Sequence, residues 1–479
     1  MSSAELKREG RRDLTEGSLL KNLFILAAPL MVQMSVQAIY NLTDAFWLGK
    51  LSPLAVTAPG VSMPFVFIAF ALAIGFGNGG TALVAQYAGA GQHDEADRAA
   101  GQTMLFLFAI SAVLSLVILL LTRPLLALVQ VPANVADTAR PYLRIFILGT
   151  PLVACAMAYG AVLRALGDTL TIVYITAAAA LLNLVLDPVL IFWMDMGVRG
   201  AAVASVIAQF TAAVTCIVLM RRGQAGLKVS LRDMRPNIAI LRRIVTIGLP
   251  AGISMSSNSV GFTVFQVMIN RLGKSVIAAF TIGFRMTHFL AIPGHAMALA
   301  AAPVVGQALG AKKAGLAHRA VRVSVLMVAL GMAVPYSLMM WQGRLVARFF
   351  VDDPDVIREA FRFFLIVPAS NYFFTVIMVL SSAFYGSGHT RPIMIVSLLR
   401  QWALRVPLAF LFGYVVGWGS IGVYVGMGIA NIVCAVLMVW IFLAGNWAKA
   451  VIPTSEEAEA RTREEGETDA GSPDTSGSD

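Results

Sequence analysis

Two aspartates, Asp44 and Asp187, lie inside long apolar stretches of a chain in which 58% of the residues are hydrophobic. A carboxylate at the centre of a membrane helix costs about 2.5–3.5 kcal/mol on insertion scales, so it is rare there and usually faces a polar interior. In such a position a carboxylate typically handles an ion, a proton or a substrate. This pair is therefore the first candidate for chemistry in the sequence.

Amide side chains recur at helical spacing beside the two carboxylates. Gln37, Asn41 and Asp44 follow one another at intervals of four and three residues, which places them on one face of a helix. Asn183 precedes Asp187 by four residues and shares its face in the same way. Each amide alone could equally be explained by a hydrogen bond between neighbouring helices. Each aspartate could equally be explained by its position near a helix end. The coincidence of face, depth and position in the chain favours a joint functional site.

The composition identifies the elements that position these groups. With 479 residues, a mean hydropathy of +0.78 and 13% charged residues, the chain differs from soluble proteins, which carry about 25% charged residues. Continuous apolar runs of about 20 residues indicate membrane-spanning helices rather than the alternating strands of a barrel. The net charge of +10 is explained by Lys and Arg in loops facing lipid headgroups, without nucleic acid as a partner.

Twelve apolar blocks predict an all-α integral membrane protein with twelve transmembrane helices. They cover residues 19–48, 54–82, 99–121, 138–162, 169–194, 200–220, 241–270, 276–306, 318–341, 357–384, 392–416 and 420–445. An even number places both termini on one side, and basic residues such as Arg11, Arg222 and Lys312 gather on that side, which we therefore assign to the cytoplasm. We expect a multi-pass protein of the cell membrane.

The two halves of the chain are a duplication. Gln307 repeats Gln86, and Pro250 repeats Pro29 at the same separation along the chain. We call the separation between Gln86 and Gln307 the repeat interval. A constant interval over several landmarks predicts two parallel six-helix lobes related by an axis along the membrane normal. Transporters built in this way hold substrate between the lobes and alternate access by rocking them.

These observations divide the chain into five segments. We expect a cytoplasmic N-terminal segment, a first lobe, a cytoplasmic inter-lobe loop, a second lobe and a disordered acidic tail. They span residues 1–18, 19–220, 221–240, 241–447 and 448–479.

The repeat serves as an internal control for the carboxylates. At the repeat interval, Asp44 corresponds to Phe265 and Asp187 corresponds to Leu408. A residue that the lobe needed for folding would tend to occur in both copies. The acids occur only in the first copy, which favours a chemical role confined to that lobe.

Helix direction places Asp44, Asn183 and Asp187 at one depth, in the extracellular third of the first lobe. Ser205 begins the sixth span near the same height. Two carboxylates, an amide oxygen and a hydroxyl are hard oxygen ligands that suit Na⁺, and two like charges held close together favour sharing a proton. We expect these four residues to form a coupling site for H⁺ or Na⁺, and the residues do not choose between the two ions.

Further residues surround this candidate site. Gln37, Asn41 and Tyr142 are expected to support it as a polar network. Pro29 removes a backbone hydrogen bond from the first helix and predicts a kink or hinge there.

Two methionines and two polar residues are candidate contacts of a substrate cavity. Met31 and Met34 offer adaptable apolar surface, and Arg285 and His288 lie three residues apart in the eighth span. Ordinary packing and structural roles explain the same residues. No catalytic set and no phosphate-binding G-x-x-x-x-G-K-[ST] motif occurs, so the energy for transport is expected to come from an ion gradient rather than an ATPase.

The chain resembles the MATE (multidrug and toxic compound extrusion) family over approximately residues 15–447. The resemblance rests on Ala28-Pro29, Tyr40-Asn41-Leu42-Thr43-Asp44, Gln86 with Gly89, Leu166-Gly167-Asp168-Thr169, Asn183-Leu184-Val185-Leu186-Asp187-Pro188 and Gly248-Leu249-Pro250. It implies a monomeric antiporter, driven by H⁺ or Na⁺ and without a further cofactor, that exports small organic, often cationic and lipophilic compounds across the lipid bilayer by alternating access. It also implies a first-lobe site of Asp44, Asn183 and Asp187, with Pro29 as the bending point.

Two details refine the resemblance. Family members with this site often have Thr where Ser205 stands, and the hydroxyl is preserved. The stretch Met255–Gly261 of the seventh span contains no acid, whereas one branch of the family uses an acid there, so the archaeal or DinF-like branch is expected. The alternative function is a lipid-linked oligosaccharide flippase of the related superfamily, which would need a strongly cationic cavity, while intramembrane basic residues are few here (Arg285, Arg400 and Arg405).

Overall fold

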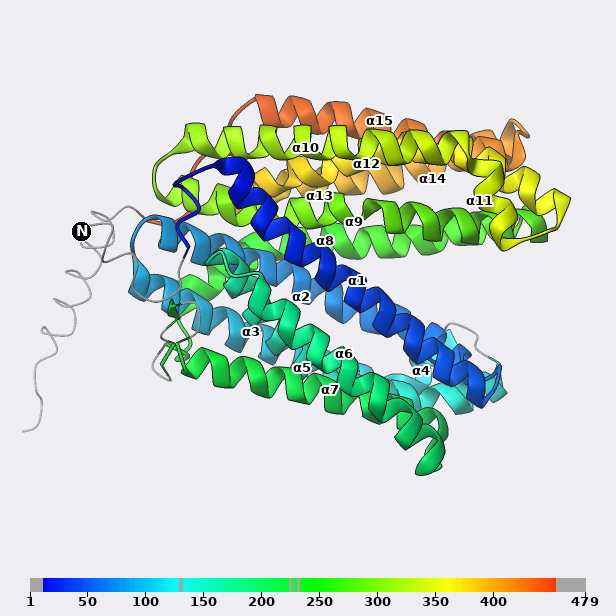
Figure 1. Cartoon of the computed structure of the whole chain (residues 1–479), viewed down its shortest axis with the longest axis horizontal. Helices are drawn as coiled ribbons and strands as arrows, with labels where there is room; N and C mark the ends of the chain where they lie inside the picture. The colour runs from blue at the N-terminus through cyan, green and yellow to red at the C-terminus, as the bar shows by residue number, and fades with distance from the viewer. Residues whose placement is uncertain (1–11, 129–131, 224–225, 228, 231–232, 454–479) are drawn as a thin grey trace, which may run out of the picture.

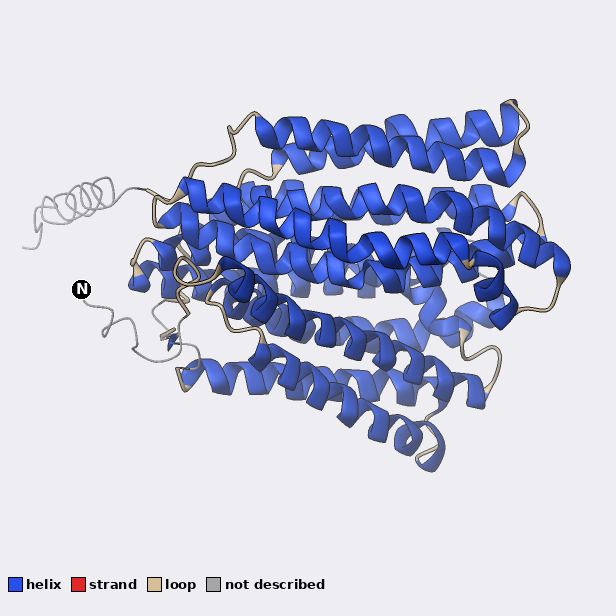
Figure 2. Cartoon of the chain, turned by 45° about the horizontal axis from the view of Figure 1, so that its top comes forward, coloured by secondary structure: helices blue, strands red, loops and turns tan. Residues whose placement is uncertain are grey.

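In the part of the chain that the computed structural model describes, all regular secondary structure is helical, and loops and turns join the helices (Figure 2). It comprises residues 12–128, 132–223, 226–227, 229–230 and 233–453. Within it, twelve helices are long and apolar enough to cross a membrane, which confirms the predicted fold class. Several helices continue past the apolar stretch that predicted them, because backbone hydrogen bonding extends into the polar ends. Most of the predicted N-terminal segment and acidic tail, and part of the inter-lobe loop, lie outside the described residues.

The first lobe contains six spans and one short helix. They are α1 (Leu19–Leu51), α2 (Thr57–Gly89), α3 (His93–Leu120), the short α4 (Thr122–Leu128), α5 (Ala133–Ala165), α6 (Leu170–Pro188) with the π-helical turn η1 (Val189–Trp193), and α7 (Gly197–Arg221).

The second lobe repeats this order. It contains α8 (Ile238–Asn270), α9 (Lys274–Gly310), α10 (Ala314–Trp341), the short α11 (Gly343–Phe350), α12 (Pro354–Ser387), a span made of α13 (Arg391–Leu398), η3 (Leu399–Arg405), α14 (Val406–Phe410) and η4 (Leu411–Val415), and α15 (Gly419–Leu443).

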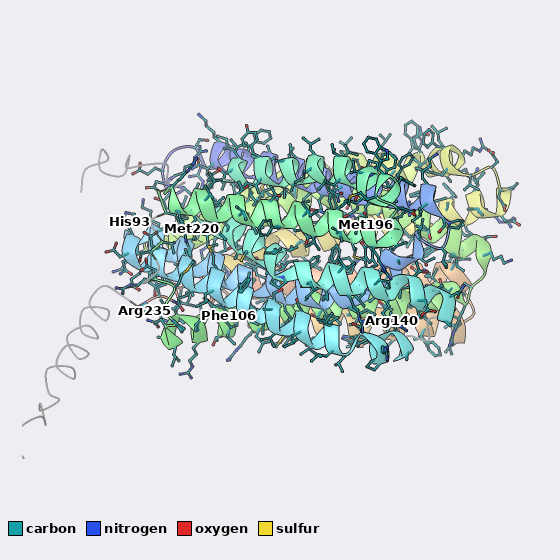
Figure 3. All side chains as sticks on the ribbon, turned by 90° about the horizontal axis from the view of Figure 1, so that it is seen from below. His93, Phe106, Arg140, Met196, Met220 and Arg235 are labelled. Atoms are coloured by element: carbon teal, nitrogen blue, oxygen red, sulfur yellow. The ribbon has the colours of Figure 1, made fainter. Side chains whose placement is uncertain are left out.

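The two lobes are joined at one end and diverge toward the other (Figure 1). At the joined end, buried residues of both lobes share hydrophobic clusters: Leu83 of α2 with Ile244 of α8, and Leu26 of α1 with Val304 of α9. At the opposite end, each lobe has a cluster made only of its own described residues. Figure 3 labels Arg235 near the joined end and Arg140 toward the diverging end. The apolar contact that holds the lobes together is therefore confined to one half of their length.

A symmetric pair of glutamines connects the lobes at the joined end. Gln86 Nε2 donates to the carbonyl oxygen of Gly386 at 2.9 Å, and Gln307 Nε2 donates to the carbonyl oxygen of Ala165 at 2.8 Å. Both glutamines are buried. Since Gly386 follows Ala165 at the repeat interval, the two hydrogen bonds obey the symmetry of the sequence repeat, and each crosses from one lobe to the other.

The same glutamines anchor the segments that flank the helical bundle. Gln307 Oε1 accepts a hydrogen bond from the backbone N–H of Leu14 at 2.9 Å, and Gln86 Oε1 accepts one from the N–H of Val451 at 2.8 Å. Val451 and Ile452 also pack against a buried cluster. The tail was expected to begin at residue 448, and in the described residues up to 453 a backbone donor and apolar side chains find partners in the bundle.

Gly89 and Gly310 allow this close approach of the lobes. A Cβ atom at Gly89 would meet the backbone of Gln307, and one at Gly310 would meet the backbone of Gln86, in both cases closer than real Cβ contacts come. The absence of a side chain at these positions lets the backbones touch, as in other closely packed membrane helices.

We predict that Gly89→Ala and Gly310→Ala each lower the unfolding temperature of the purified protein, because overpacking of this kind costs about 1–3 kcal/mol. Gly331→Ala in α10 is the control, since a Cβ at Gly331 meets nothing within 4 Å and alanine favours a helix over glycine by about 1 kcal/mol. Thermal unfolding in detergent measures the effect. Equal unfolding temperatures for all three variants would contradict the close-contact assignment.

Candidate cation site

Asn183 and Asp187 face the interior of the first lobe from adjacent turns of α6. Both side chains are fully buried, and Asn183 Nδ2 donates to Asp187 Oδ1 at 3.1 Å. Their spacing of four residues makes them neighbours on the helix surface. Pro188 is the last residue of α6, and the backbone continues as the π-helical turn η1, a local feature that often accompanies functional sites.

Asp44 contributes the second carboxylate from α1. Its side chain is 8% exposed and lies near enough to Asp187 for the two groups to interact electrostatically. Within this site, three buried oxygens have no hydrogen-bond partner among the described residues: Asp44 Oδ1, Asp187 Oδ2 and Asn183 Oδ1. A buried polar atom without a partner costs about 1–3 kcal/mol. A proton or a small cation between these oxygens would provide the missing partner.

Tyr40 and Ser205 border the carboxylates from α1 and α7. Tyr40 Oη donates to Ser205 Oγ at 2.8 Å, and Ser205 is buried. Tyr142 of α5 is also buried, and both phenols lie within electrostatic range of Asp44 and Asp187. Four helices thus supply the site. Tyr40 was not among the predicted site residues, although its spacing of four residues before Asp44 is the same signal that paired Asn183 with Asp187.

The chemistry of the site is that of oxygen ligands alone. No three His, Cys, Asp or Glu side chains come together within the described ranges. The arrangement therefore offers two carboxylates, one amide oxygen and hydroxyl groups. These groups suit a hard monovalent cation or a proton better than a transition metal, which prefers imidazole and thiolate ligands.

Gln37 and Asn41 lie outside this cluster. Both are exposed, and Gln37 Nε2 donates to Asn41 Oδ1 at 3.4 Å. No hydrogen bond between described residues joins either amide to Asp44. Gln37 and Asn41 were expected to join Asp44 because the three share one helix face. Asp44 is buried inside the lobe, whereas the two amides are exposed on α1.

Helix α1 contacts both lobes. Near its start, Leu26 and Leu30 belong to a core cluster of the second lobe, while Leu48 near its end belongs to a cluster of the first lobe. Figure 1 shows α1 crossing diagonally between the two bundles. Pro29 lies in the half that packs on the second lobe, and Met31 and Met34 are partly buried against the same cluster. The two methionines therefore have packing partners, and their contact with a substrate cavity stays a prediction.

Arg285 and His288 are exposed on α9. The ring of His288 lies between those of Phe284 and His295, at centroid distances of 6.2 and 6.3 Å. No contact between described residues brings Arg285 or His288 to the carboxylates.

The second lobe has a polar cluster of opposite charge that spacing along the chain did not predict. Arg400 is buried, and it donates to Asn258 Oδ1 at 2.6 Å and to Asn431 Oδ1 at 3.2 Å. The guanidinium of Arg405 lies 4.4 Å from the ring centroid of Phe265, the residue that the repeat pairs with Asp44. Where the first lobe holds acids, the second lobe thus holds bases.

Twelve spans in two repeated lobes, with a buried acidic site in the first lobe, are the architecture of a multi-pass membrane transporter. A family model described as MatE matches residues 29–189 and 250–411. The two matches begin at Pro29 and Pro250, which the repeat pairs with each other. The chain therefore belongs to the MATE family.

Curated relatives and solved structures agree with this assignment. The chain is 26% identical, over 91% of its length and 95% of the relative, to the "Probable multidrug resistance protein NorM" of Thermotoga maritima. It is 24% identical to the "FAD transporter" of Shewanella oneidensis, over 85% of this chain and 91% of that protein. A structure described as "Crystal structure of MATE in the bent conformation" matches with a TM-score of 0.85 and 25% identity, covering 91% of this chain and 97% of the other.

We predict that Tyr40→Phe and Ser205→Ala each destabilise the protein by about 0.5–1.5 kcal/mol through loss of one hydrogen bond, and that the double variant is no less stable than either single variant. Ser205→Thr, which retains the hydroxyl, is the matched control. Chemical unfolding in detergent measures the cycle. Fully additive losses would show that the two side chains act independently.

Proposed function

We propose that this protein is a cation-coupled antiporter that exports organic, lipophilic cations by alternating access, with its coupling site in the first lobe. The observation that carries the proposal is the set of three buried oxygens without partners on Asp44, Asn183 and Asp187. Such a set is costly when empty and favourable when a proton or Na⁺ is bound. The second lobe has no acid at the positions that correspond to the two aspartates.

Coupling follows from a site whose occupancy changes the packing of α1. Loading of one H⁺ or Na⁺ offsets one of the two negative charges of Asp44 and Asp187, and this reduces their mutual repulsion and supplies a partner for their buried oxygens. Since α1 carries Asp44 near its far end and packs on the second lobe near Pro29, a bend at Pro29 would transmit the change in the site to the contact between the lobes.

The direction of transport requires an orientation in the membrane. We assign the joined end, which includes both described termini, to the cytoplasm of a cell-membrane protein, because basic residues such as Arg221, Arg222 and Lys312 lie there. The diverging end then faces outward. The protein is proposed to act as a monomer of the archaeal or DinF-like branch.

The flippase alternative has weaker support. It needs basic residues that converge on a polyanionic headgroup, but Arg400 is engaged by Asn258 and Asn431 inside the second lobe, and Arg285 lies on the exposed face of α9.

We predict that purified protein in liposomes moves ethidium, a lipophilic cation, when a pH gradient or a Na⁺ gradient is imposed. Asp44→Asn and Asp187→Asn should each reduce gradient-driven transport by about tenfold or more, since coupling free energies are typically about 1–3 kcal/mol. Fluorescence of the dye reports its movement, and applying the two gradients separately identifies the ion.

Asp195→Asn is the matched control, because Asp195 is exposed in the turn that follows η1 and the substitution is chemically the same. Full gradient-driven transport in both carboxylate variants would overturn the coupling site. Gradient-driven movement of FAD without movement of ethidium would overturn the substrate class and leave the coupling site standing.

A further inference from the structure

A cavity of about 830 Å³ opens at the joined end of the second lobe, away from the carboxylate site. The ends of four helices surround it: the first turns of α8 and α13, and the last turns of α12 and α15. It therefore lies where the membrane-spanning bundle meets its polar boundary.

Arginines dominate the charge of this cavity. Arg242, Arg243 and Arg391 line it, and no carboxylate is among its lining residues. Arg243 donates to Tyr87 Oη at 3.0 Å, whereas the side chains of Arg242 and Arg391 have no hydrogen bond or ion pair with any described residue. His389 adds a buried Nδ1 that also lacks a partner among the described residues. Burial and the nearby Lys449 lower the pKa of His389, which disfavours a positive charge on its ring.

The rest of the wall is apolar and aromatic. Ile247, Phe384, Trp440, Ile441 and Trp447 contribute to it, and Trp440 is 68% exposed. Tryptophan is enriched at the level of lipid headgroups, where its ring has an apolar body and a polar edge. A ligand that fills this cavity must therefore carry negative charge at one end and hydrocarbon at the other.

The repeat retains only part of the basic wall, because Arg242 corresponds to Lys21 whereas Arg243 corresponds to Asn22. At the repeat interval, Arg391 corresponds to Leu170 and Trp440 corresponds to Leu219. Arg391 and Trp440 are thus particular to the second lobe, although the helices that carry them occur in both.

We propose that this cavity binds an anionic phospholipid, with its phosphate between Arg242, Arg243 and Arg391 and an acyl chain along Trp440 and Ile441. Basic pockets between transmembrane helices at the cytoplasmic face hold such headgroups. The acidic stretch 454–479 is an alternative occupant that would balance the charge of the arginines. It contains no aromatic, Leu, Ile or Val side chain to cover the apolar wall of the cavity. This proposal of lipid binding does not depend on whether transport is coupled to an ion.

The test uses delipidated full-length protein and native mass spectrometry with phosphatidylglycerol or phosphatidylcholine. The wild type should retain phosphatidylglycerol preferentially, and the variant R242Q/R243Q/R391Q should lose that preference by about tenfold or more. The control R221Q/R222Q/R319Q removes the same charge from exposed positions at the same end and should retain the preference. Thermal unfolding shows whether each variant is folded.

Four results would overturn the proposal. Equal retention of both lipids by the wild type would remove the anionic specificity, and equal loss in both triple variants would show a general effect of charge. A preference that appears only after deletion of residues 454–479 would make the acidic tail the occupant. Displacement of the bound lipid by inorganic phosphate alone would show that a free anion, rather than a lipid, is recognised.

Discussion

A polar side chain buried among membrane helices needs a partner within the protein, because hydrocarbon offers none. Gln86 and Gln307 satisfy this requirement with both atoms of each amide, across the contact between the lobes and to the segments that flank the bundle. At the site of Asp44 and Asp187, buried oxygens have no such partner among the described residues. The first arrangement stabilises one relative position of the lobes, and the second leaves buried oxygens for the cation that we propose.

The two lobes share one fold but differ in charge. In the first lobe, the carboxylates lie among phenols, an amide and a hydroxyl from four helices, whereas the second lobe places Arg405 over Phe265, the counterpart of Asp44. Duplication therefore preserved the helices and the glutamine contacts, while the polar interiors diverged. Helix α1 belongs to both lobes through its packing, which gives the acidic site a physical connection to the lobe that lacks it.

Helical periodicity predicted the features that depend on local spacing. The twelve spans, the constant repeat interval and the neighbouring positions of Asn183 and Asp187 follow from separations along the chain. The hydrogen bond between Tyr40 and Ser205 and the cluster of Arg400 with Asn258 join residues far apart in sequence, and spacing does not reveal such pairs. Residues 448–453 were assigned to the tail because acidic and polar residues follow them from Ser455 onward, and the hydrogen bond from Val451 to Gln86, 365 residues away, could not be predicted from spacing.

The central claim is that substrate and cation use one coupled cycle through Asp44 and Asp187. The most direct test is reciprocal: an imposed ethidium gradient across liposomes, with no ion gradient, should drive H⁺ or Na⁺ in the opposite direction. The account predicts this counter-movement in the wild type and its loss in Asp44→Asn and Asp187→Asn. Movement of ethidium without any cation flux, or cation flux that persists in both variants, would contradict it.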